Sequence, residues 1–185
     1  MKTLLKLKKE LKALPKKIFN YYIDLIVRTF KYVRQIVYAA GINALVMIPL
    51  VQVTRLVMNH FGFVEPTMIA GDDPFSGLSV PVLAVMCLGI GIFEETYFRY
   101  LIMECLMGKA LKWPKWMALV VSSCIFGAAH LANPGGWLVT LPQAVGAAGA
   151  GFWFAHIYKK HGLHFAILTH ALYDFAIFIL ALYIK

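Results

Sequence analysis

One apolar segment that carries ionisable residues constrains this chain more than any other feature. It runs from about residue 79 to residue 103 and exceeds the ~20 residues that a helix needs to cross a bilayer. Glu94, Glu95 and Arg99 lie inside it. A charged group at the bilayer centre costs at least about 2.5–3.5 kcal/mol on insertion scales. These three side chains therefore need polar partners within the protein.

Helical spacing separates the roles of the two glutamates. Glu95 and Arg99 are four residues apart, so they share a helix face, with the acid on the favoured N-terminal side. Glu94 points about 100° away, because a helix has ~3.6 residues per turn. We therefore predict a structural ion pair between Glu95 and Arg99. Glu94 is left to face a polar group from elsewhere in the chain.

The composition places the rest of the chain in a membrane as well. Hydrophobic residues make up 61% of the 185 residues and charged residues only 15%, which a soluble domain of this length does not show. The apolar runs are long and continuous, and a β-barrel would require alternation. We expect an all-α, polytopic helical membrane protein with about five transmembrane helices.

The basic residues indicate which partners to expect. The formal net charge is +9, but Lys and Arg flank the apolar runs, where they meet anionic lipid headgroups. The lipid bilayer is therefore an expected partner and nucleic acid is not. The three cysteines show no spacing typical of a disulfide framework or of a Cys-based metal site.

The chain divides into two expected regions. Residues 1–35 form a basic amphipathic or interfacial segment, although a solvated tail would have the same composition. Residues 36–185 form the transmembrane core, with its polar motifs within residues 79–185. Pro49 is expected to kink the first span, because proline removes one backbone hydrogen bond. The expected spans cover residues 36–58, 79–103, 116–131, 137–158 and 163–184.

The loops between these spans predict the orientation. Lys and Arg lie before the first span, between the second and third, and between the fourth and fifth, whereas the other loops have none. Because positive loops stay in the cytoplasm, we expect a multi-pass protein of the cell membrane with a cytoplasmic N-terminus.

Three motifs lie in three separate expected spans, and each contains two residues that are four apart and share a helix face. They are Glu94-Glu95-x-x-x-Arg99, Phe126-x-x-x-His130 and His170-x-x-x-Asp174. Polar groups in lipid are satisfied mainly by one another. We therefore expect Glu94, His130, His170 and Asp174 to line one cavity. His130 lies near the end of its expected span, so either the cavity is off-centre or the third span extends further than residue 131.

These residue types suit hydrolysis. Cleaving a peptide bond requires a base to activate water and donors to stabilise the oxyanion. A shielded carboxylate beside a histidine can supply the base. Two histidines and a carboxylate would also suit zinc, but no HExxH pair is present. From the residues alone, a metal-free and a zinc-dependent hydrolase both remain open.

The three motifs, in this order, resemble the CPBP family, also called the Abi family. It comprises CAAX proteases and bacteriocin-processing enzymes and includes the Rce1-type prenyl-protein proteases. The resemblance implies an intramembrane endopeptidase without metal or other cofactor, in which Glu94 and His130 activate a water. It also implies that His170 and Asp174 stabilise the oxyanion. Many members have Asn where this chain has Asp174, and an unprotonated Asp would orient His170 rather than donate.

Other functions fit part of the pattern. The substrate is expected to be a membrane-associated protein or peptide. A non-catalytic bacteriocin-immunity or scaffold protein could use the same fold, but such a protein does not require an unpaired buried Glu94. A proton-coupled transporter also uses buried acids and histidines, but about five spans without a repeat are few for alternating access.

Overall fold

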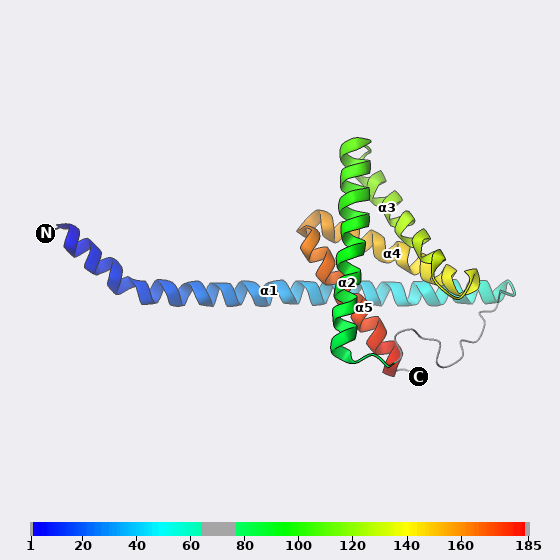
Figure 1. Ribbon diagram of the computed structural model, residues 1–185, viewed down its shortest axis with the longest axis horizontal. Coiled ribbons are helices and arrows are strands. Elements are labelled where there is room, and N and C mark those ends of the chain that lie inside the picture. The colour runs from blue at the N-terminus through cyan, green and yellow to red at the C-terminus, as the bar shows by residue number, and fades with distance from the viewer. Residues whose placement is uncertain (1, 64–76, 184–185) are drawn as a thin grey trace. The chain divides into compact units, whose positions relative to one another are not determined.

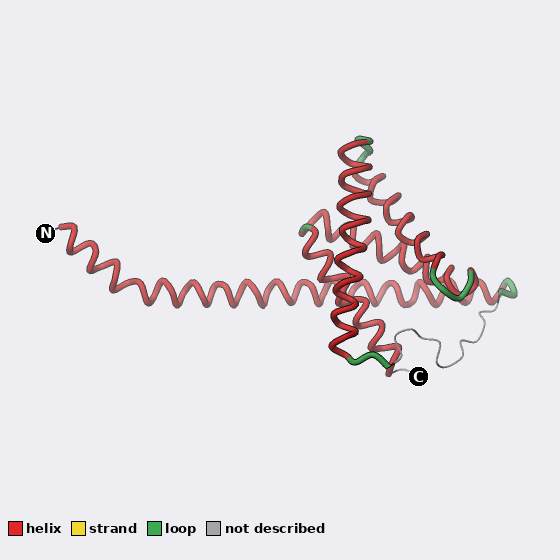
Figure 2. Tube along the Cα trace, in the orientation of Figure 1, coloured by secondary structure: helices red, strands yellow, loops and turns green. Residues whose placement is uncertain are grey.

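The structure is a computed structural model, and it describes residues 2–63 and 77–183. Every regular element within these ranges is a helix (Figures 1 and 2). The elements are α1 (Lys2–His60), α2 (Val80–Glu94), the π-helix η1 (Glu95–Ala110), α3 (Lys115–Ala129), the short 3₁₀-helix η2 (His130–Ala132), α4 (Trp137–His161) and α5 (Leu163–Tyr183).

Five helical stretches among the described residues are long and apolar enough to cross a membrane. They are Ile23–His60, Val80–Ala110, Lys115–Ala132, Trp137–His161 and Leu163–Ala181. The expected class, an all-α polytopic membrane protein, is thereby confirmed. The last two stretches begin at the residues expected from the sequence. Each follows a glycine with positive φ, Gly136 at 74° and Gly162 at 89°, a conformation that other residues rarely adopt.

The first helix differs from its expected form. We expected an interfacial helix ahead of a span that begins at residue 36, whereas α1 is unbroken from Lys2 to His60. The helix also continues past Pro49. Most of the loop expected between residues 59 and 78 lies outside the described residues.

The chain divides into two compact units, an N-terminal unit of residues Met1–Val37 and a core unit of residues Tyr38–Lys185. The N-terminal unit is helical, and Asp24 and Arg28 form an exposed ion pair at 2.8 Å one turn apart. Large apolar side chains such as Phe30, which is 75% exposed, also lie on its surface. Whether this unit rests on a membrane surface stays a prediction.

Close helix contacts build the core unit. α3 packs along α4, and α2 packs along α5. Small residues make these approaches possible: a Cβ at Gly127 would lie 2.6 Å from the Ala144 carbonyl oxygen, and one at Gly91 would lie 3.0 Å from that of Ile167. Small residues serve the same purpose at many helix contacts in lipid. The result is that the polar motifs of α2–η1, α3 and α5 come together.

The part of α1 that belongs to the core unit contacts α4. The indole N–H of Trp153 donates a 3.0 Å hydrogen bond to the backbone carbonyl of Ala39. Two turns further on, Met47 packs against Ala150 and Phe154. These contacts place the first span beside the helix that covers the polar motifs.

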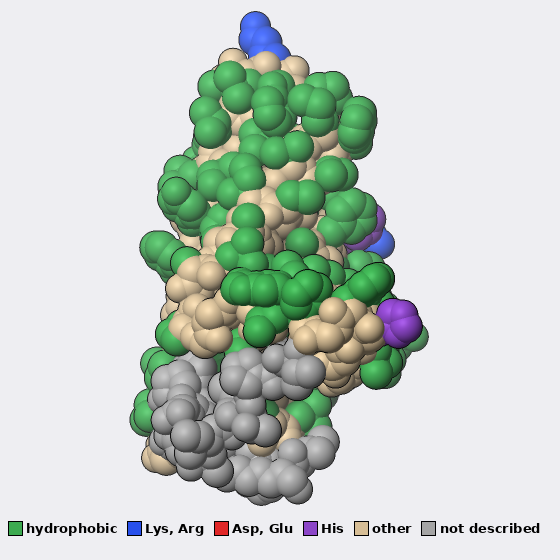
Figure 3. All heavy atoms as spheres, turned by 90° about the vertical axis from the view of Figure 1, so that its right-hand side faces the viewer, with side chains coloured by type: hydrophobic (Ala, Val, Ile, Leu, Met, Phe, Trp, Pro, Cys, Tyr) green, Lys and Arg blue, Asp and Glu red, His purple; other side chains and the backbone are tan. Residues whose placement is uncertain are grey.

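The exposed side chains of the core unit suit a lipid environment. Leu45, Val85 and Phe93 are 76%, 71% and 69% exposed. On the face drawn in Figure 3, most coloured side chains are hydrophobic, and the few Lys or Arg side chains in view lie at the top end and at the right-hand edge. Apolar exposure on this scale is normal for a surface that contacts hydrocarbon and abnormal for one that contacts water.

Candidate active site

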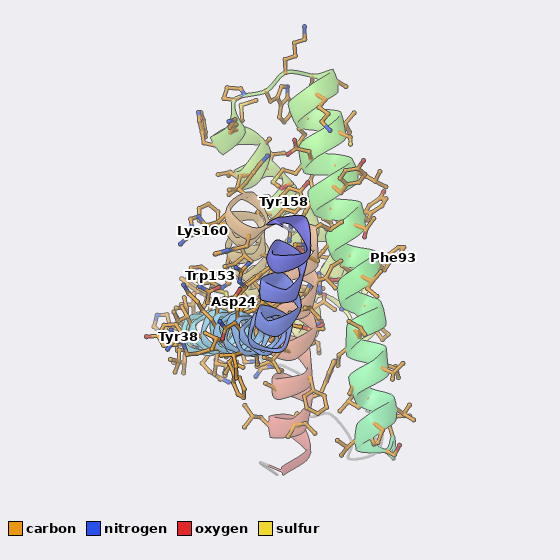
Figure 4. The ribbon with its side chains drawn as sticks, turned by 90° about the vertical axis from the view of Figure 1, so that its left-hand side faces the viewer. Asp24, Tyr38, Phe93, Trp153, Tyr158 and Lys160 are labelled. Atoms are coloured by element: carbon orange, nitrogen blue, oxygen red, sulfur yellow. The ribbon has the colours of Figure 1, made fainter. Side chains whose placement is uncertain are left out.

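The junction of α2 and η1 gives three consecutive residues three different environments. Phe93 points away from the other helices (Figure 4). The side chain of Glu94 is 23% exposed, whereas that of Glu95 is 0% exposed. Glu95 forms an ion pair with Arg99, whose Nε lies 3.1 Å from Oε2 of the carboxylate. Glu94 is therefore the glutamate that water can reach.

His170, on α5, is the side chain around which the acids gather. Its Nδ1 lies 2.9 Å from Oε1 of Glu95. Its Nε2 lies 3.3 Å from Oδ2 of Asp174 and 3.6 Å from Oε2 of Glu94. The last distance is too long for a hydrogen bond, but a protonated His170 would attract the Glu94 carboxylate across it. Helix α5 thus brings His170 and Asp174 against both glutamates of the first motif.

His130 lies where α3 ends and η2 begins. Its Nδ1 lies 2.9 Å from the backbone carbonyl of Phe126, an oxygen that can only accept. Nδ1 therefore carries the proton, and Nε2 of a neutral ring is left as an acceptor. The ring of His130 meets the ring of Phe126, which also meets that of His170. His130 therefore lies on the same side of the bundle as the α5 residues.

Aromatic rings complete the surroundings of both histidines. The Phe126 ring meets the rings of His130 and His170 edge-on, with centroids 4.9 and 5.9 Å apart. Phe154 of α4 stacks on His170 with a centroid distance of 4.3 Å and an angle of 16°. The site is therefore a polar cluster within aromatic walls, where the low dielectric strengthens each charge interaction.

The structure places all four predicted catalytic residues in this neighbourhood. Direct contacts join Glu94, His170 and Asp174, and His130 joins them through the shared Phe126 ring. That the four line one cavity stays a prediction, because these contacts do not themselves define a hollow.

Two features of the site were not predicted. The first is the contact between Glu95 and His170, which are 75 residues apart, so no local spacing could reveal it. The second is the contribution of α4: a Cβ at Gly151 would lie 2.8 Å from Phe126 and 3.2 Å from Nη2 of Arg99. The run of small residues in α4 signalled close packing, but it did not indicate which side chain would fill the space.

Among residues 2–63 and 77–183, no group of three or more His, Cys, Asp or Glu side chains is arranged to hold a metal ion. Whether the reaction depends on a metal stays a matter for experiment.

The fold and the site together define a class: a multi-pass helical membrane protein with acids and histidines clustered between its spans. A comparison with protein families agrees with this class. Residues 76–176 match the family described as type II CAAX prenyl endopeptidase Rce1-like, a match that covers more than half of the 185 residues. The chain belongs to this Rce1-like family. No curated protein and no solved structure matched the chain in the same comparisons.

Proposed function

We propose that the chain is an intramembrane endopeptidase that hydrolyses a peptide bond in a membrane-associated protein or peptide. In this reaction Glu94 and His130 activate a water, and His170 with Asp174 stabilises the oxyanion. The observation that carries the proposal is the position of Glu94, a partly exposed carboxylate directed at His170 within an apolar helix bundle. Membership of the Rce1-like family supports the same reaction class.

The two glutamates differ in the properties that a general base needs. A base must reach the water that it deprotonates. Glu94 is 23% exposed and forms no ion pair with Arg99, so its carboxylate is available to a water. Glu95 is 0% exposed and already holds Arg99. Glu94 is therefore assigned as the base.

His130 is suited to carry the proton onward. Its Nδ1 is held by the Phe126 carbonyl, so its Nε2 can accept a proton. The water proton passes to Glu94 as the oxygen attacks the carbonyl carbon. Glu94 then returns this proton through His130 to the leaving nitrogen as the C–N bond breaks. Each proton removed from water is thereby returned to a product.

His170 is assigned to the oxyanion. Its Nε2 is directed at the space between Glu94 and Asp174, and a donor at this position stabilises the charge that develops on the carbonyl oxygen. Asp174 lies 3.3 Å from that nitrogen, which suits a side chain that orients His170. Asn at this position could orient the same ring or donate to the oxyanion itself.

The membrane environment sets the substrate class and location. The protein spans a membrane several times, so a substrate must reach the bundle from the lipid or from its surface. The basic loops favour a cytoplasmic N-terminus in the cell membrane. The family description names CAAX prenyl substrates, which makes a prenylated CAAX peptide the first substrate to test.

The decisive experiment compares purified wild type with Glu94→Gln on a farnesylated CAAX peptide. Gln keeps the shape and polarity of the side chain but cannot act as a base, so turnover should fall by at least about 10²-fold, the low end of general-base effects. Glu104→Gln, on the same helical stretch Val80–Ala110 but outside the site, is the matched control and should cleave normally. Full activity of Glu94→Gln would exclude Glu94 as the base. Peptide profiles of membranes from cells with wild type or Glu94→Ala extend the search to other substrates.

Two further measurements separate the chemical alternatives. Asp174→Asn should lose less activity than Glu94→Gln, because Asn still contacts His170. Activity should also survive exhaustive chelation. Activity that disappears with a chelator and returns with zinc would favour a zinc-dependent protease. A wild type that cleaves no peptide but binds a partner in membranes would favour the immunity or scaffold alternative.

A further inference from the structure

The buried ion pair in the first motif has a second contact that an ion pair does not need. Oε2 of Glu95 accepts a hydrogen bond from Nε of Arg99 at 3.1 Å. Its other oxygen, Oε1, lies 2.9 Å from Nδ1 of His170. The side chains of Glu95 and Arg99 are both 0% exposed, and that of His170 is 4% exposed. One carboxylate therefore joins a buried arginine to the histidine of the proposed site.

The aromatic walls leave one property of His170 unfixed. Stacking on Phe154 at 4.3 Å and 16° holds the plane of the ring. It does not determine which edge of the ring faces which neighbour, because a half-turn of the imidazole keeps the same plane. After such a turn, a carbon would replace Nε2 beside Glu94 and Asp174, and the donor assigned to the oxyanion would be lost.

The contact with Glu95 distinguishes the two edges. A buried carboxylate accepts a hydrogen bond from Nδ1–H, whereas it would gain little from the ring carbon that a half-turn would present. Arg99 holds the other oxygen of Glu95, so the carboxylate cannot turn away from the histidine. We propose that Glu95 is a positioning residue: it accepts a hydrogen bond from Nδ1–H of His170 and so keeps the Nε2–H of the same ring directed at Glu94 and Asp174. This proposal rests on the proposed function, in which His170 acts through Nε2.

The opposing view is that Glu95 serves only to neutralise Arg99. The two views differ in what happens when both charges are removed. A buried ion pair can often be replaced by apolar residues of similar volume without loss of stability. If Glu95 is only a counterion, every neutral replacement of the pair should therefore work equally well. If it positions His170, a replacement must still provide an acceptor for Nδ1–H.

Two double variants make this distinction. Glu95→Gln/Arg99→Met keeps a carbonyl oxygen that can accept from Nδ1–H, and Glu95→Leu/Arg99→Met does not. Both are neutral, and neither leaves a buried charge unpaired. With the farnesylated CAAX peptide, the Gln variant should turn over at least about tenfold faster than the Leu variant, the low end of the loss found when a ligating histidine loses its hydrogen-bond partner. The difference should appear in kcat rather than in KM, because the substrate does not contact Glu95.

A spectroscopic measurement tests the positioning without any substrate. In ¹⁵N-histidine spectra of the protein in detergent, the His170 signals are identified by their absence in His170→Gln. Both ring nitrogens of His170 should carry a proton in wild type and in the Gln double variant, with Nδ1–H donating to the side chain at position 95 and Nε2–H directed at Asp174. In the Leu double variant, Nδ1 should lose its proton, because the buried N–H has no acceptor.

The outcomes separate this inference from the proposed function. Equal Nδ1 protonation in the two double variants would overturn the positioning role, and so would equal kcat values. If wild type cleaves no peptide but the spectra differ as expected, the positioning of His170 stands and the proposed activity fails. If both double variants are unfolded, the spectrum of wild type decides, because an Nδ1 of His170 without a proton would overturn the positioning role.

Discussion

The two ends of η1 carry ion pairs of similar chemistry in different surroundings. Near its start, Glu95 pairs with Arg99 inside the bundle, and both side chains are 0% exposed. Near its end, Glu104 pairs with Lys159 of α4, where the two side chains are 29% and 34% exposed. The first pair lies beside the acids and histidines of the site, and the second lies where the helices approach the basic loops.

This difference teaches what burial does to a pair of charges. Water and salt screen the outer pair, so its contribution to stability should be small. The inner pair has no water to replace a lost partner, so removing one member leaves a charge in a low-dielectric interior. Arg99 has few alternatives: in the described part of the chain its Nη1 and Nη2 find no hydrogen-bond partner, although its guanidinium lies 4.9 Å from the centre of the Phe126 ring.

The largest effect on stability is expected for Arg99→Met. This substitution leaves the buried carboxylate of Glu95 without its cation and should lower the free energy of unfolding by about 3–5 kcal/mol. Unfolding in mixed micelles of mild detergent and dodecyl sulfate measures the change. The double variant Glu95→Leu/Arg99→Met should recover most of it. If Arg99→Met is as stable as wild type, the contrast between the buried and the exposed ion pair fails.

An intermediate effect is expected for Gly151→Ala. The added Cβ would meet Phe126 at 2.8 Å and Arg99 at 3.2 Å, so the walls of the inner pair must shift, at a cost of about 1–3 kcal/mol. Gly89→Ala is the matched control, because no atom lies within 4 Å of its Cβ. Replacing an exposed helical glycine by alanine should stabilise the protein by up to about 1 kcal/mol. Thermal unfolding measures both variants. A loss of stability in Gly151→Ala together with a gain in Gly89→Ala would support the tight packing around the inner pair, and stability changes of the same sign would contradict it.

The smallest effect is expected at the outer pair. Glu104→Gln removes its ion pair with Lys159 and should change stability by less than about 1 kcal/mol. Added salt should reduce even this difference, because the charges are exposed. The same unfolding measurement at two salt concentrations provides the test. A loss as large as that of Arg99→Met would show that exposure does not separate the two pairs.

Much of the fold could be predicted because lipid imposes a simple rule. Apolar runs of sufficient length form helices that satisfy their own backbone groups, and the last two spans begin where glycines interrupt the chain. The start of the first span was harder to locate. Charged residues such as Arg28 and Lys31 made the preceding segment resemble a separate interfacial helix, although nothing in its backbone interrupts α1.

The site could be predicted only as far as local spacing reaches. Residues four apart on one helix meet regardless of the rest of the fold, which is why the contacts of Glu95 with Arg99 and of His170 with Asp174 could be anticipated. The contact between Glu95 and His170 depends on how α2, η1 and α5 pack together. This contact changes the role assigned to Glu95, because a residue expected to be purely structural contacts His170.

The hydrogen bond from Trp153 to Ala39 also gives the protein an intrinsic fluorescence probe. Indole emission depends on the polarity and hydrogen bonding around its N–H. Phe substitutions at Trp113, Trp116 and Trp137 would leave Trp153 as the only source of this fluorescence. Its emission would then report whether the first span is seated on α4, an event that leaves helix content unchanged and that circular dichroism cannot detect.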